Sequence, residues 1–121
     1  RWAGRCISMD RRERDMVIRK KMLNEIADIE SFILGMEASD FSESRVSQKA
    51  VMMSLINIGE LSKSFSDEYL ASTNSIPWKE IRGLRNIAAH QYDAIRIPNV
   101  WITIEQDIPA LKKALLAHPL S

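Results

Sequence analysis

The stretch that decides the fold of this chain is Val51-Met-Met-Ser-Leu-Ile-Asn-Ile58, near the middle of the sequence. Wound into a helix, it is apolar on most sides, and a helix of that kind needs neighbours around it. We therefore predict that residues 45–65 form the central helix of a helical bundle. Two serines that precede this segment, Ser42 and Ser44, are candidate N-caps.

Three other segments, at residues 10–35, at residues 77–90 and from Pro98 onward, repeat apolar residues every three or four positions. This spacing is typical of a helix that buries one face. Pro109 interrupts the last segment and should kink the helix or restart it after Asp107. The apolar positions are Ile18, Met22, Ile26, Ile29 and Ile33 in the first segment, Trp78, Ile81, Leu84 and Ala88 in the second, and Trp101, Ile104, Ile108, Leu111 and Leu115 in the third.

The segments between these helices are polar and carry turn residues. Residues 37–44 are expected to be a connection, and residues 66–75 a loop with one helical turn. Helices joined in this way predict an all-α protein, an antiparallel bundle of four to five helices. The chain of 121 residues fits one domain, which we place at residues 9–121. Residues 1–8 lack any periodicity and are interpreted as a non-native or disordered leader.

Composition excludes several classes of protein. Seventeen basic and sixteen acidic residues give a formal net charge of +1, so bulk charge alone does not hold the protein on nucleic acid or a membrane. The single cysteine, Cys6, excludes an intramolecular disulfide and a zinc site built from several cysteines. Because no apolar run approaches the roughly 20 residues of a membrane-spanning helix, we expect a cytoplasmic protein without membrane contact.

Polar groups of catalytic type crowd one segment, Arg82-Gly-Leu-Arg-Asn-Ile-Ala-Ala-His-Gln-Tyr92. Asn86 and His90 are four residues apart and share a face of the predicted helix. Arg85 precedes His90 by five residues, which places the two about 140° apart around the helix axis. A long arginine reaches part of that way near a helix end, and it can also meet a histidine from a second copy across a twofold axis.

These residue types suit the cleavage of a phosphodiester. Histidine titrates near neutral pH and can move protons at a reacting oxygen. Arginine is permanently charged, can bind two phosphate oxygens, and stabilises the extra charge of the transition state. No cluster of carboxylates stands nearby in the sequence as a magnesium site, so we expect chemistry without a metal or other cofactor. Such chemistry is feasible on RNA, whose 2′-hydroxyl is a built-in nucleophile.

A simpler interpretation applies to the same residues. Arginine and histidine near a helix C-terminus can serve only the helix dipole or an ion pair. Tyr92 can be a packed aromatic residue, and Asn86 a solvated helix residue. Residue types and spacing alone leave both interpretations open.

The complete motif Arg85-Asn-Ile-Ala-Ala-His90-Gln-Tyr92 resembles the signature of the HEPN superfamily of helical-bundle ribonucleases, and specifically of the HepT-like toxins. That signature is Arg, four residues, His, one residue, Tyr. Flanking features are similar as well: Gly59-Glu60 late in the second predicted helix, Ile76-Pro77-Trp78 opening the third, and Val100-Trp101 early in the last. The resemblance covers nearly all of residues 9–121.

The resemblance implies a homodimer in which two Arg/His motifs meet near the dimer axis and form a composite, metal-independent endoribonuclease site. Arg85 would hold and stabilise the scissile phosphate, and His90 would transfer protons. Asn86 would orient the phosphate or His90. Two further basic residues of the same helix, Arg82 and Lys79, are candidate RNA-binding residues.

The resemblance also implies the toxin of a toxin–antitoxin system, silenced by an MntA-like nucleotidyltransferase that attaches AMP to the motif tyrosine, here Tyr92. A bulky anion two residues from His90 would block the cleft and offset the charge of Arg85.

The alternatives to a toxin are a catalytically idle helical partner that binds the nucleotidyltransferase or a nucleotide, and a purely structural dimer. The near-neutral net charge favours an idle partner, whereas four basic against two acidic residues at 79–96 favour a nuclease.

Overall fold

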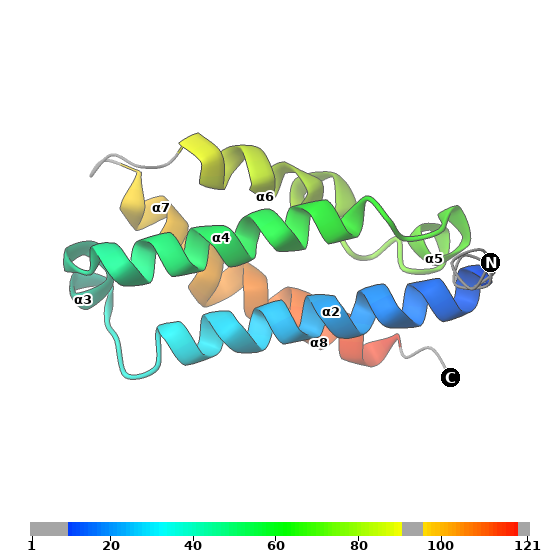
Figure 1. The fold of residues 1–121 in the computed structure, drawn as a ribbon, viewed down its shortest axis with the longest axis horizontal. Helices are drawn as coiled ribbons and strands as arrows, with labels where there is room; N and C mark the ends of the chain where they lie inside the picture. Colours follow the sequence, from blue (N-terminus) through cyan, green and yellow to red (C-terminus); the bar gives the residue numbers. More distant parts are fainter. Residues whose placement is uncertain (1–9, 91–95, 119–121) are drawn as a thin grey trace, which may run out of the picture.

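The structure, a computed structural model, describes residues 10–90 and 96–118, and it leaves the side chains of residues 87–90 outside that description. Its long helices run alternately up and down and form an antiparallel bundle (Figure 1). The predicted all-α fold is confirmed, and no strand occurs in the described ranges. The elements are α2 (Arg11–Phe32), α3 (Ala38–Glu43), α4 (Arg45–Ser62), α5 (Asp67–Ser72), α6 (Trp78–His90), α7 (Ile97–Ile102), the π-helix η1 (Thr103–Asp107) and α8 (Ile108–Ala117).

Helix α4 lies between α2 and α6 and packs against both (Figure 1). Its predicted apolar run supplies the centre of the core, since Val51, Leu55 and Ile58 are completely buried. Met53 points the other way and is 58% exposed, so the run is not buried on every side. The predicted stripes of the other helices also face this core; Ile33 is half-buried but packs against it, and the side chain of Ala88 is outside the description.

Side-chain caps fix where the first long helices begin. Asp10 caps α2 by accepting a hydrogen bond from the backbone N–H of Glu13 at 2.8 Å. Ser44 caps α4 by accepting one from the backbone N–H of Ser47 at 3.2 Å. The prediction that Ser44 is a cap is therefore confirmed. Ser42 is not a cap, because it lies inside α3.

The connection predicted at residues 37–44 is wrong in one respect, because it contains the short helix α3. The only large apolar residue of the segment is Phe41, and it is completely buried. Its ring packs on Trp101, with ring centroids 5.4 Å apart and planes tilted by 40°. A single aromatic anchor thus holds α3 against α7, and one apolar residue does not produce a detectable period in the sequence.

The predicted break before Pro109 is confirmed. The last long helix widens into the π-helix η1 and then continues as α8 from Ile108. Proline has no N–H to donate to the carbonyl four residues earlier, so the backbone ahead of it is free to adopt the wider turn. Ile104 and Ile108 stay buried across the change, so the apolar stripe is continuous.

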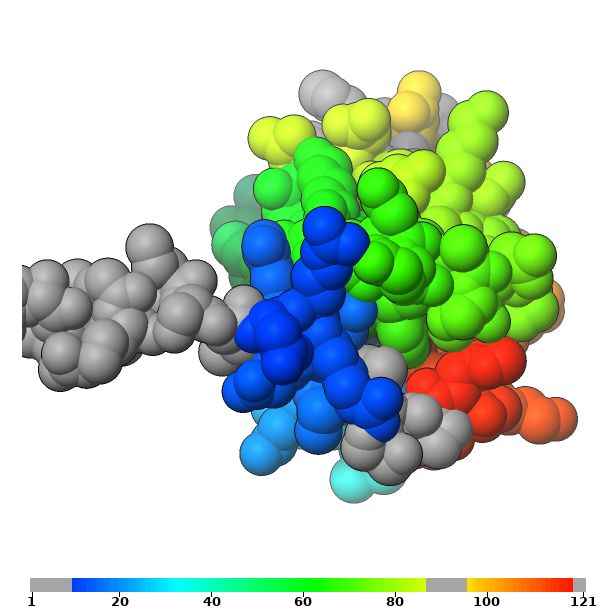
Figure 2. Space-filling view, turned by 90° about the vertical axis from the view of Figure 1, so that its right-hand side faces the viewer, coloured from blue at the N-terminus to red at the C-terminus, as the bar shows by residue number. Residues whose placement is uncertain are grey.

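Polar contacts tie the start of α2 to the other elements at the same end of the bundle. The carboxylate of Asp15 is buried and accepts hydrogen bonds from the backbone N–H of Ser66 at 2.8 Å and from its hydroxyl at 2.6 Å. Arg19 donates its Nε–H to the carbonyl of Leu115 at 3.0 Å. Seen from this end, α2, α5 and the last turns of α8 lie together (Figure 2). None of the helices in the described ranges is both long and apolar enough to span a membrane.

Candidate functional site

Helix α6 carries the candidate site, and an aromatic cluster fixes where it begins. Trp78, its first residue, donates its indole N–H to the hydroxyl of Thr73 at 3.0 Å. The Trp78 ring also packs at 5.2 Å from the ring of Phe65, which stacks on Tyr69 at 4.3 Å. Burial raises the pKa of the Tyr69 hydroxyl in this cluster. These contacts set the position of α6 on the bundle.

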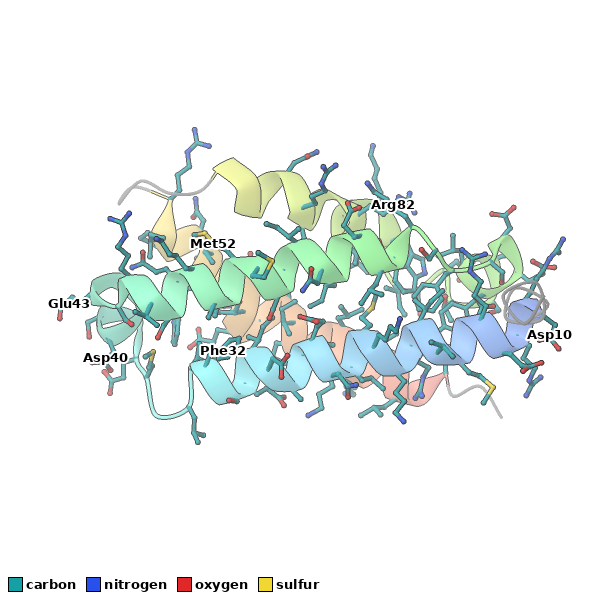
Figure 3. All side chains as sticks on the ribbon, viewed as in Figure 1. Asp10, Phe32, Asp40, Glu43, Met52 and Arg82 are labelled. Atoms are coloured by element: carbon teal, nitrogen blue, oxygen red, sulfur yellow. The ribbon has the colours of Figure 1, made fainter. Side chains whose placement is uncertain are left out.

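The two sides of α6 differ in the way that the sequence predicts. Trp78, Ile81 and Leu84 face the core and are nearly inaccessible to solvent. The polar candidates lie on the remaining surface of the helix, where Arg85, Asn86 and Lys79 are exposed and Arg82 is half-exposed. Arg82 is labelled on α6 in Figure 3, in the layer separated from α2 by α4.

The backbones of α4 and α6 approach closely at Gly59. A Cβ atom at this position would lie 3.0 Å from the backbone nitrogen of Arg85 and 3.3 Å from the carbonyl oxygen of Arg82. Such contacts are too short for an alanine unless the helices shift, so glycine is what permits the approach. By contrast, a Cβ at Gly83 in α6 would meet no atom within 4 Å. The last turns of α4 are therefore fixed against the turn of α6 that holds Arg85.

This approach brings an acidic residue to Arg85. The Oε1 atom of Glu60 lies 3.2 Å from the Nε atom of Arg85 and 3.1 Å from the Nζ atom of Lys63. The side chains of Arg85 and Glu60 are 54% and 49% exposed, so the pair lies at the surface. Among the predicted site residues, Arg85 thus has a described partner, Glu60, to which the sequence assigns no role beyond the Gly59-Glu60 feature.

A shallow groove of about 470 Å³ runs beside this ion pair, between α2 and α4. Its wall includes Glu60 and a hydrogen bond from the Asn57 side chain to the Oε1 atom of Glu25, at 3.3 Å. Lys21 and Asn24 contribute further polar groups from α2. The groove is open, and its wall carries side chains of both charges.

The other half of the motif lies partly or wholly outside the described residues. His90 is the last residue of α6, but its side chain is outside the description, and Tyr92 is outside it altogether. Residues 1–8, interpreted above as a leader, also lie outside the described residues. Among the side chains that are described, no three of the histidine, cysteine, aspartate or glutamate type are grouped so that they could bind a metal ion.

Comparison with known proteins identifies the family. The sequence matches the model of the HepT-like ribonucleases over residues 22–117. A Methanocaldococcus jannaschii protein provisionally named as an RNase is 30% identical over 92 residues, 76% of this chain and 84% of its own length. A Thermococcus cleftensis protein provisionally named ribonuclease HepT is 33% identical over 97 residues, 77% of this chain and 88% of its own length. No solved structure matches the chain. The chain therefore belongs to the HepT-like ribonuclease family of the HEPN superfamily.

Proposed function

We propose that this protein is a metal-independent endoribonuclease, the toxin of a toxin–antitoxin system. The observation that carries the proposal is the position of Arg85, which stands in a complete family motif and is presented to solvent from the polar side of α6. Family membership supports ribonuclease activity in general. The described geometry supports a phosphate-binding role for Arg85, because an exposed guanidinium at a rigid contact between two helices is available to an anionic ligand.

In the proposed reaction the 2′-oxygen of RNA attacks the adjacent phosphorus, and the bond from phosphorus to the 5′-oxygen breaks. Arg85 binds the phosphate and stabilises the charge that develops on it. His90 takes part in the proton transfers, from the 2′-hydroxyl or to the departing 5′-oxygen. Asn86 orients the phosphate or His90, and Lys79 and Arg82 bind the flanking RNA. The products would carry a 2′,3′-cyclic phosphate and a 5′-hydroxyl.

We propose that the site is completed by a second copy of the chain. Around the helix, residues 85 and 90 are about 140° apart, which favours the pairing of Arg85 with His90 of another protomer. The outer side of α4 also carries exposed apolar residues, Val46 at 80% and Met53 at 58% exposure. Both lie on the same side of α4 as Glu60, because the three are spaced by seven residues. This apolar row leads to Arg85 and suits a contact between protomers.

The experiment that tests the proposed activity is cleavage of RNA by the wild-type protein in EDTA. We expect the same rate with EDTA as with added magnesium, because Arg85 and His90 supply the charge and the protons. The products are to be separated on a denaturing gel and their ends analysed for cyclic phosphate. A His90→Ala preparation purified in parallel controls for contaminating nucleases. Intact RNA in every condition would contradict the proposed activity and favour the idle helical partner.

We also propose that an MntA-like nucleotidyltransferase silences the toxin by attaching AMP to Tyr92. The support is the resemblance of the motif, together with the charge argument that an anion there would offset Arg85. After incubation with the cognate transferase and ATP, mass spectrometry should detect one added AMP on the wild-type protein and none on Tyr92→Phe. Tyr69→Phe is the matched control, since that tyrosine is buried and its loss should leave the modification intact. AMP on the Tyr92→Phe protein would refute the assignment.

A further inference from the structure

Glu60 is an acidic residue in direct contact with the proposed phosphate-binding group. A carboxylate beside a phosphate site repels the substrate, so its presence there calls for a reason. Its contact is specific in geometry: Oε1 faces the Nε atom of Arg85 at 3.2 Å and is itself held by the Nζ atom of Lys63 at 3.1 Å. The carboxylate therefore has two cationic neighbours, one on its own helix and one on α6.

A contribution to the stability of the fold does not explain why Glu60 lies beside Arg85. Both side chains of the Glu60–Arg85 pair are about half exposed, and an ion pair in that environment contributes little to the free energy of unfolding. The neighbouring residue, Gly59, already brings the two helices together through backbone contact. The ion pair thus adds little to the packing, and its effect is on the direction of the Arg85 side chain.

Resting on the ribonuclease function proposed above, we propose that Glu60 is a positioning residue for Arg85. An unrestrained arginine loses much rotamer freedom when it engages the transition state, so holding it beforehand lowers that cost. A carboxylate at Nε engages the inner side of the guanidinium. The outer edge, formed by the two Nη atoms, is the edge that can bind two oxygens of the scissile phosphate. Lys63 keeps the Glu60 carboxylate in place.

Positioning and simple charge predict different kinetics for Glu60→Gln, which removes the charge and keeps the size. If Glu60 positions Arg85, kcat should fall by about 10- to 100-fold, the range expected when a reacting group is misplaced. KM for RNA should stay the same or fall, because a negative charge near the phosphate has been removed. If Glu60 acted only through its charge, kcat would not fall.

The matched control is Glu30→Gln. Glu30 pairs with Lys112 at 3.0 Å, and its side chain has the same 49% exposure as that of Glu60, but it lies on the contact between α2 and α8. We expect this variant to cleave RNA with wild-type kcat and KM. Unchanged cleavage by Glu60→Gln would overturn the positioning role while leaving the ribonuclease activity of the wild type established. An equal loss in both variants would overturn it as well, because the effect would then not be local.

A second measurement does not depend on activity. The Nε–H signal of Arg85 in a nitrogen-resolved NMR spectrum can be assigned by its disappearance in Arg85→Lys. We expect Glu60→Gln to shift this signal and to speed its exchange with water, and Glu30→Gln to leave it unchanged. An unmoved signal would overturn the proposal. If the signal moves but the wild-type protein leaves RNA intact, the ion pair holds, while the ribonuclease activity and with it the positioning role are refuted.

Discussion

Arg85→Ala and His90→Ala are each expected to lower the rate of RNA cleavage by about a hundredfold to ten-thousandfold, with little change in the stability of the fold. In the proposed reaction the arginine would supply the fixed positive charge at the phosphate, and the histidine would supply the proton transfers. The two act in one transition state, so the double variant should lose little more than either single variant. Initial rates on a short labelled RNA would measure the effect.

The stability of Arg85→Ala separates chemistry from folding. Arg85 is exposed and its partner Glu60 retains Lys63, so the free energy of unfolding should change by at most about 1 kcal/mol. Arg11→Ala is the control, since Arg11 is also an exposed arginine paired with a carboxylate, that of Glu68, near the start of α2. The Arg11→Ala variant should cleave RNA at the wild-type rate. Wild-type cleavage by Arg85→Ala would exclude the arginine from the site.

Phe41→Ala is expected to destabilise the fold by about 3–5 kcal/mol, the cost typical of removing a buried aromatic side chain. Phe41 is completely buried and holds α3 against Trp101 of α7. Denaturant unfolding at a fixed protein concentration would measure the difference. Because α3 is short, the variant should also lose helical circular dichroism at this end of the bundle before the main transition.

The control for that substitution is Phe32→Ala. Phe32 is the last residue of α2 and is 36% exposed, so the same change in side-chain size should cost well under half as much. Equal destabilisation by the two variants would show that α3 is not anchored through Phe41.

The sequence predicts those helices in which apolar residues recur with the helical period. The stripe of α2 and the apolar run of α4 follow the helical period and are found as helices with buried faces. Pro109 acts through its own backbone chemistry, so the break ahead of it is also predictable. Helix α3 is not predictable from the sequence, because it is stabilised by one aromatic residue, Phe41, in contact with Trp101. A partner 60 positions away leaves no local pattern in the sequence.

The candidate site was likewise predictable only in part. The exposed side of α6 that carries Arg85 and Asn86 is predictable from spacing within one helix, whereas the motif was identified by its resemblance to the family. The pairing of Arg85 with Glu60 depends on how α4 and α6 are placed along each other, which residue spacing within either helix does not specify. Gly59 was visible as part of a sequence feature, but its meaning depends on the backbone of Arg85 lying opposite it.

The glycine at position 59 has a consequence for how the proposed catalytic centre would assemble. Because the backbones of α4 and α6 approach closely there, a contact within one chain places Glu60 beside Arg85. In the proposed dimer, the direction of the Arg85 guanidinium would therefore be set within each chain before the second chain binds. Formation of the proposed dimer would then only have to bring His90 of the second chain to that guanidinium.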